Sequence, residues 1–171
     1  TDASALDGLE RIDGTLSIMS NNDLEGLPDF DLLTTLGGLS IVTTPKLGSV
    51  SGFHAVTSPM GDVSFAGSAP LSTLSALSQV PSINKLTVSN VVADTVQILG
   101  GVQEAGEIEI NLECTHLDAL AALHGAASVI FEARGLETAQ GTLSSLVKTD
   151  GPVSVKCTDC KEIPSFASLE K

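Results

Sequence analysis

Short stretches of alternating apolar and polar residues recur along this chain at a nearly constant spacing. In each stretch two apolar residues flank one other residue, which is typical of a β-strand with one buried face. Seven such pairs occur, and their first members lie 21 to 24 residues apart. The pairs are Leu16/Ile18, Leu39/Ile41, Val63/Phe65, Leu86/Val88, Ile108/Ile110, Val129/Phe131 and Val153/Val155. Repetition at this interval predicts one structural unit per repeat, with the units stacked on one another.

A small residue precedes each apolar pair by two positions. These residues are Gly14, Gly37, Gly61, Asn84, Gly106, Ala127 and Gly151. Glycine and asparagine tolerate a positive φ, so we expect a left-handed backbone conformation at this point of each repeat. Ala127 does not fit that rule, and it predicts a different turn in its own repeat.

Between the strand stretches, apolar residues recur at every third position, for example Leu24, Leu27, Phe30, Leu33 and Leu36. A sustained period of three is too short for a long amphipathic α-helix. It predicts short flat or 3₁₀-like sides, in which residues three apart share one face. The predicted fold class is therefore all-β with short 3₁₀ or helical turns. The architecture is a parallel β-solenoid of about seven turns with a period of 21–24 residues.

Composition and charge narrow the classes of partner. The chain is 42% hydrophobic but only 3% aromatic, with no Trp or Tyr, which suits a narrow coil filled by rows of Leu, Ile and Val. Its net charge of −13 disfavours nucleic acid and anionic membrane surfaces. No apolar run approaches the roughly 18 residues of a membrane span. We therefore expect no nucleic-acid partner and no membrane insertion.

The two ends of the chain carry the same apolar rows as its middle. The first residue is Thr1, and no signal peptide is visible. No polar capping segment is visible either, although solenoids usually have one. We expect a single solenoid domain over residues 1–171 that is processed, or is a fragment or truncated array of a longer protein.

The run from Leu6 to Leu24, LDGLERIDGTLSIMSNNDL, places apolar residues, Gly14 and Asn21 at fixed offsets. This pattern resembles the receptor L-domain family, whose members are leucine-rich-repeat-like solenoids of growth-factor receptor ectodomains and microbial surface proteins. The likeness covers residues 1–100 best. The position of Asn21 becomes, in later repeats, Thr44, Ser68, Val91, Glu113 and Arg134, of which the last three depart from the pattern. The resemblance implies a right-handed solenoid and an extracellular or cell-surface, non-catalytic module.

Three cysteines, Cys114, Cys157 and Cys160, allow two interpretations. They are small buried hydrophobic residues, or two of them form a disulfide. Cys114 and Cys160 would lie two turns apart, about 9.6 Å from the strand spacing, which exceeds the limit of about 7 Å between bridged Cα atoms. Cys157 and Cys160 are the more feasible pair, whereas a redox function of this motif lacks a βαβ context. A zinc site with His116 lacks a second ligand pair near Cys114, so we expect no metal and no cofactor.

Candidate catalytic groups are sparse. The histidines His54, His116 and His124 are scattered, and no nucleophile motif accompanies them. Four acidic residues, Glu104, Glu107, Glu109 and Glu113, would suit calcium or a carboxylate pair. Lys85 and Arg134 on neighbouring strands would compensate their charge, which favours a solvated face with cross-strand pairs. We therefore predict no catalytic residue, a ladder of Asp62, Lys85 and Glu107, and a pair between Glu132 and Lys156.

The outward strand positions predict a contact surface. In the first four repeats they form a column of small hydroxyl residues beside a short apolar row of Met19, Val42 and Ala66, and we expect nothing to protrude. The predicted binding face consists of Ser17, Met19, Ser40, Val42, Ser64, Ala66, Thr87 and Ser89. Because parallel sheets are usually covered on both faces, an open one invites a partner.

Three functional hypotheses follow. The first is a non-catalytic extracellular or cell-surface recognition or scaffold module that binds a protein partner through this face. The second is a structural solenoid that self-associates end to end through unpaired strand edges. The third is a polysaccharide-acting β-helix enzyme, against which the missing Trp and Tyr and the missing catalytic motif both count.

Overall fold

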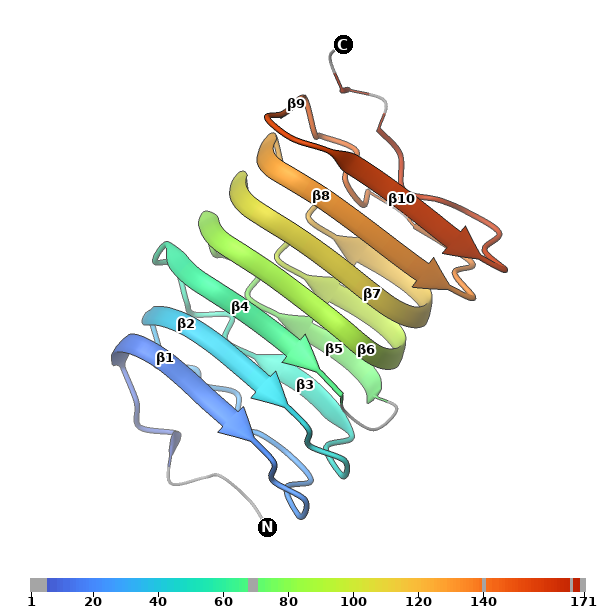
Figure 1. Ribbon diagram of the computed structural model, residues 1–171. Coiled ribbons are helices and arrows are strands. Elements are labelled where there is room, and N and C mark those ends of the chain that lie inside the picture. Colours follow the sequence, from blue (N-terminus) through green and yellow to red (C-terminus); the bar gives the residue numbers. More distant parts are fainter. Residues whose placement is uncertain (1–5, 68–70, 140, 167, 170–171) are drawn as a thin grey trace.

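The computed structural model describes residues 6–67, 71–139, 141–166 and 168–169. In these ranges the chain is nearly all β-structure with almost no helix, coiled into a parallel β-solenoid of about six turns (Figure 1). The strands are β1 (Arg11–Met19), β2 (Thr35–Val42), β3 (Ser49–Gly52), β4 (Met60–Ala66), β5 (Leu71–Ala76), β6 (Ser82–Ile98), β7 (Glu104–Ala119), β8 (Gly125–Arg134), β9 (Lys148–Thr149) and β10 (Val153–Thr158). The predicted fold class is confirmed, with about six turns in place of the expected seven.

One parallel sheet, which we call the main sheet, runs the length of the stack in the order β1-β2-β4-β6-β7-β8-β10. The apolar pairs identified in the sequence lie in register along it. The column Ile18, Ile41, Phe65, Val88, Ile110 and Phe131 is at most 7% exposed. Val155 continues this column but is 37% exposed, because no turn of the described chain covers β10. The predicted continuous buried column therefore ends one turn early.

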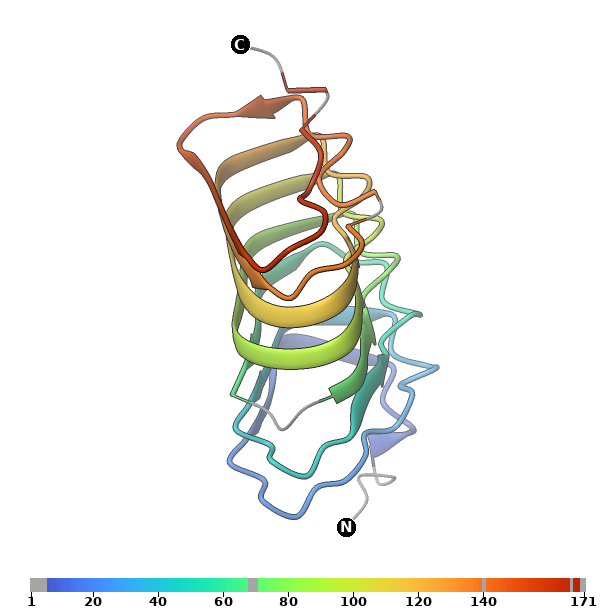
Figure 2. The ribbon, with the colours of Figure 1, turned by 90° about the vertical axis from the view of Figure 1, so that its right-hand side faces the viewer.

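Of the two forms predicted for the sides between main-sheet strands, short flat or 3₁₀-like, the flat form is present in the middle turns. They contain a second row of parallel strands, in which β3 pairs with β5 and β5 pairs with the second half of β6. The strands β6 and β7 run through both rows and curve around the corner between them (Figure 2). Part of the period of three arises from tight turns beyond this row, such as the one in which the Leu33 N–H donates to the Phe30 carbonyl. The step from Leu71 to Leu74 instead lies within β5.

Six buried residues with positive φ form the corner after the second row of strands. They are Phe30, Phe53, Leu77, Leu99, Leu120 and Leu143, with φ between 53° and 59°. A left-handed conformation costs an L-residue roughly 1–2 kcal/mol. Burial offsets that cost, since each side chain is at most 1% exposed, and the Phe30 and Phe53 rings stack with centroids 4.4 Å apart. The corner therefore depends on packing rather than on glycine.

The small residue before each apolar pair does not have a positive φ, so that expectation is wrong. Close approach of the backbone explains the glycines instead. A Cβ on Gly37 would overlap the Asp13 carbonyl oxygen of the turn below, and one on Gly106 would overlap the Asn84 carbonyl oxygen. Ala127 lies within the regularly paired part of β8, so it does not mark a different turn.

Replacing Ile41 or Ile110 with Ala should lower the free energy of unfolding by about 2–5 kcal/mol, because each change leaves a cavity in the column. Urea unfolding followed by circular dichroism measures the loss. Val88 and Val155 provide a matched comparison in the same column, since Val88 is 0% exposed and Val155 is 37% exposed. Val88→Ala should destabilise the chain more than Val155→Ala, and equal losses would contradict the assignment of the column.

Gly37→Ala and Gly106→Ala should each lower the free energy of unfolding by about 1–3 kcal/mol, because the added methyl group forces two turns apart. Gly14 is the control, since it occupies the equivalent position in the first turn and no atom lies within 4 Å of its Cβ position. Gly14→Ala should leave the urea midpoint nearly unchanged. A loss of stability at Gly14 equal to that at Gly37 would show that backbone conformation, rather than close approach, selects glycine.

Candidate functional site

The predicted binding face is assembled as the sequence indicated. The strand register stacks Ser17, Ser40, Ser64 and Thr87 in one column and Met19, Val42, Ala66 and Ser89 in the next. All eight residues are exposed or half-buried, and Met19 is 57% exposed. They lie on β1, β2, β4 and the first half of β6, so one face of the main sheet carries them all. The same two columns continue into charged and larger residues in later turns: Glu109, Ile130 and Ser154, and Asn111, Glu132 and Lys156.

The predicted charge ladder is also present on this face. Asp62, Lys85 and Glu107 are partners on adjacent strands, and Lys85 Nζ lies 2.8 Å from Glu107 Oε2. The hydrogen bond to Glu107 and the nearby negative charge raise the pKa of Lys85. Asp62 instead accepts a hydrogen bond from Asn84 Nδ2 at 2.8 Å. The ladder therefore consists of one ion pair and one amide–carboxylate contact.

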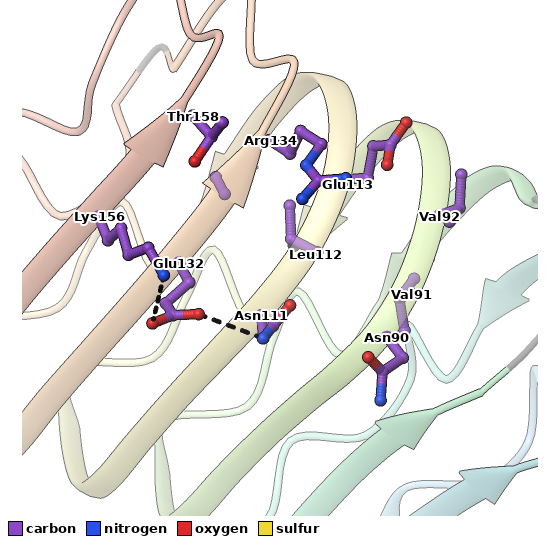
Figure 3. Close-up of a pocket in the computed structure, with 11 residues that line it drawn as sticks. Asn90, Val91, Val92, Asn111, Leu112, Glu113, Glu132, Arg134, Lys156 and Thr158 are labelled. Carbon is purple, nitrogen blue, oxygen red and sulfur yellow. Dashed lines mark hydrogen bonds and ion pairs between the residues drawn. The ribbon is translucent and has the colours of Figure 1, made fainter.

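A polar groove, which we call the corner groove, lies where the main sheet turns toward the second row of strands (Figure 3). Its volume is about 320 Å³. It crosses four turns, from β6 to β10. It is lined by Asn90, Val91, Val92, Asn111, Leu112, Glu113, Glu132, Ala133, Arg134, Lys156 and Thr158. No sequence pattern predicted a site at this position.

The corner groove exists because β7 lacks a residue at this corner. In β6 the left-handed Asn90, with φ of 53°, has no partner, since Ser89 pairs with Asn111 and Val91 pairs with Leu112. The strand β7 thus passes the corner one residue shorter than β6. The signal in the sequence is the spacing of 21 residues between Ile108 and Val129, the shortest interval between successive apolar pairs.

Paired charges line one wall of the corner groove. Asn111 Nδ2 donates to Glu132 Oε2 at 3.3 Å, and Lys156 Nζ lies 3.7 Å from Glu132 Oε1, as the dashed lines in Figure 3 show. The predicted Glu132–Lys156 pair is thereby confirmed. Glu113 and Arg134, on the other wall, are partners on adjacent strands. With buried Leu112 and Ala133 beneath, this arrangement offers charge and hydrogen bonds for binding a polar group.

The acidic residues that suggested calcium are not gathered into one site. Glu107 and Glu109 lie on the main sheet, Glu104 begins β7, and Glu113 lies beyond the corner in the groove wall. Across the described ranges, no group of three or more His, Cys, Asp or Glu side chains is arranged to hold a metal ion. His116 Nδ1 lies 2.8 Å from the Thr138 hydroxyl oxygen, an arrangement that involves no cysteine.

The three cysteines are free thiols near the last turns of the stack. Cys114 lies on β7 and is 4% exposed, whereas Cys157 on β10 and Cys160 after it are half-buried. The strand β8 lies between β7 and β10, which agrees with the predicted separation of two turns. Burial raises the pKa of the Cys114 thiol to about 12.

Of the first three residues at the asparagine position of the receptor L-domain pattern, two lie within the described part of the chain. Asn21 Nδ2 donates to the Met19 carbonyl at 3.0 Å, and Thr44 is fully buried, whereas Ser68 lies outside the described residues. No helix in the described part of the chain is long and apolar enough to cross a membrane. In the comparisons with known proteins, no family model, curated protein or solved structure matches this chain.

Replacing Lys85 with Glu would stack three carboxylates on neighbouring strands and should lower stability. Because the side chain is exposed, the loss should be larger at low than at high salt. Urea midpoints of the wild type and of Lys85→Glu at two salt concentrations measure this difference. Lys46→Glu is the control for a general charge effect, because it breaks a different exposed pair, Lys46–Asp23, in an earlier turn. A salt-independent loss for Lys85→Glu would contradict the ladder.

Proposed function

We propose that this chain is a non-catalytic, extracellular or cell-surface recognition or scaffold module that binds a protein partner through the main sheet. The observation that carries the proposal is the uncovered face of the first four turns, where a column of hydroxyl side chains lies in register beside a short apolar row that begins with Met19. Parallel sheets usually have both faces covered, and this face has no covering element in the described chain. A partner therefore has a broad, even surface to contact.

The chemistry of the face supports a protein partner. Hydroxyl groups of Ser40, Ser64 and Thr87 supply hydrogen bonds, and Met19 with Val42 adds exposed apolar area. Most of a protein interface consists of such mixed polar and apolar contacts. The net charge of −13 favours a basic partner and accelerates encounter with it. The receptor L-domain resemblance points to the same kind of module.

Self-association is the second candidate, and the open end of the stack favours it. Val155 belongs to the buried column yet is 37% exposed, and Leu16 in the first strand is half-buried. A second copy placed end to end would cover these residues. Sedimentation of the purified chain over a range of concentrations distinguishes the candidates. An end-to-end assembly should dissociate on Val155→Asp, whereas a contact through the sheet face should not.

The double change Ser40→Arg and Val42→Arg should abolish partner binding without unfolding the chain, since both side chains point outward on β2. Thr73→Arg with Ser75→Arg is the matched control, because these half-buried residues occupy outward positions on β5 in the second row of strands. The measurement compares proteins retained by each immobilised variant, together with the urea midpoint. The opposite result would be partner binding that survives Ser40→Arg/Val42→Arg but is lost in the control variant Thr73→Arg/Ser75→Arg. It would show that the second row of strands is the contact surface.

A further inference from the structure

Cys157 and Cys160 converge at the last turn of the solenoid. Cys157 lies on β10 and pairs with Ala133 of β8. The chain then reverses at Asp159, whose φ is 56°. The reversal brings Cys160 Sγ to 3.7 Å from the Ala133 carbonyl oxygen and 3.6 Å from the Thr158 carbonyl oxygen. Both cysteines therefore lie beside the same residue of β8.

Cys114 does not share this position. It is 4% exposed inside β7, and β8 separates it from β10. Cys157 and Cys160 are half-buried, so a small reagent reaches them from the end of the stack. A left-handed residue between two cysteines is strained for a non-glycine side chain, and the surroundings hold it in place. Burial of Cys114 therefore favours the pair of Cys157 and Cys160 over a pair that includes Cys114.

We propose that Cys157 and Cys160 form a reversible intramolecular disulfide that closes the last turn of the solenoid. The oxidant is a small-molecule disulfide such as glutathione disulfide. One of the two cysteine sulfurs attacks it and loses its proton, which releases one small thiol and leaves a mixed disulfide. The other cysteine sulfur then loses its proton and displaces the second small thiol. The chain loses two protons and two electrons, and one disulfide becomes two thiols.

The second step is intramolecular, because the mixed disulfide on one cysteine lies beside the other cysteine at the end of β10. Burial raises the pKa of Cys157 to about 12. The proximity of the two sulfurs compensates for the small fraction of thiolate at neutral pH.

The disulfide has a local structural consequence. Val155 is 37% exposed and Ile163 is 63% exposed. These apolar side chains of the last turn are therefore more exposed than the buried column in the middle of the stack. A bond between Cys157 and Cys160 fixes the reversal at Asp159 and holds the segment after it against β10. Oxidation should therefore slow hydrogen exchange in residues 153–166 and leave β2 and β4 unchanged.

The test equilibrates the full native chain with mixtures of reduced and oxidised glutathione, quenches with an alkylating reagent and maps the peptides by mass spectrometry. We expect one intramolecular Cys157–Cys160 bond, with Cys114 alkylated only after denaturation. Cys114→Ala should leave the equilibrium constant unchanged, whereas Cys157→Ser or Cys160→Ser should abolish the intramolecular bond. A bond to Cys114, disulfide-linked dimers or no bond in excess glutathione disulfide would overturn the proposal.

Two comparisons separate the contribution of the fold from that of sequence proximity. A synthetic peptide of residues 155–162 contains both cysteines without the solenoid. The native chain should form the bond at least about tenfold more favourably than this peptide. Asp159→Val should lower the constant by about tenfold because a β-branched residue resists positive φ, whereas Asp159→Gly should retain it. Equal constants for chain and peptide would refute a pair organised by the fold.

Discussion

Backbone hydrogen bonding between successive turns is the interaction on which the rest of this structure depends. It holds neighbouring strands about 4.8 Å apart and places each residue over its equivalent one turn earlier. Side chains of similar type therefore lie next to one another along a column, as Ile18 and Ile41 do. The same constraint excludes a side chain where backbones come closest, so glycine occupies position 37 over Asp13. It also makes Lys85 a neighbour of both Asp62 and Glu107.

The main sheet could be predicted from the sequence because alternation and spacing together determine its register. The second row of strands could not, because apolar residues at every third position are compatible with a 3₁₀ segment and with a short strand ending in a tight turn. The positive φ at the corner after the second row of strands could not be predicted either. Leu77 and Leu99 adopt positive φ through burial, and nothing about leucine indicates it. The expected positive φ at the glycines before the apolar pairs was wrong for a related reason. Positive φ and close backbone approach both select glycine, so the residue type alone does not distinguish them.

The surface could be predicted only where it follows the register. Both outward columns of the predicted binding face lie as expected, because strand register alone places equivalent residues in a column. The corner groove depends on one absent residue in β7, which changes the distance between the walls rather than the residue types. Its polar lining resembles an ordinary solvated strand in the sequence. The short spacing of 21 residues after Ile108 was the available signal, and it carries no chemical information.

The short corner of β7 also bears on how such a chain changes during evolution. Deleting one residue inside a strand reverses the inside and outside of everything that follows it within that strand. At the corner the same deletion is absorbed, because Leu112 resumes the buried position opposite Val91 with its alternation intact. Single-residue insertions and deletions should thus accumulate at corners, where they reshape the rim and leave the interior unaltered. Surface variety then arises in this architecture without any change to the hydrophobic interior.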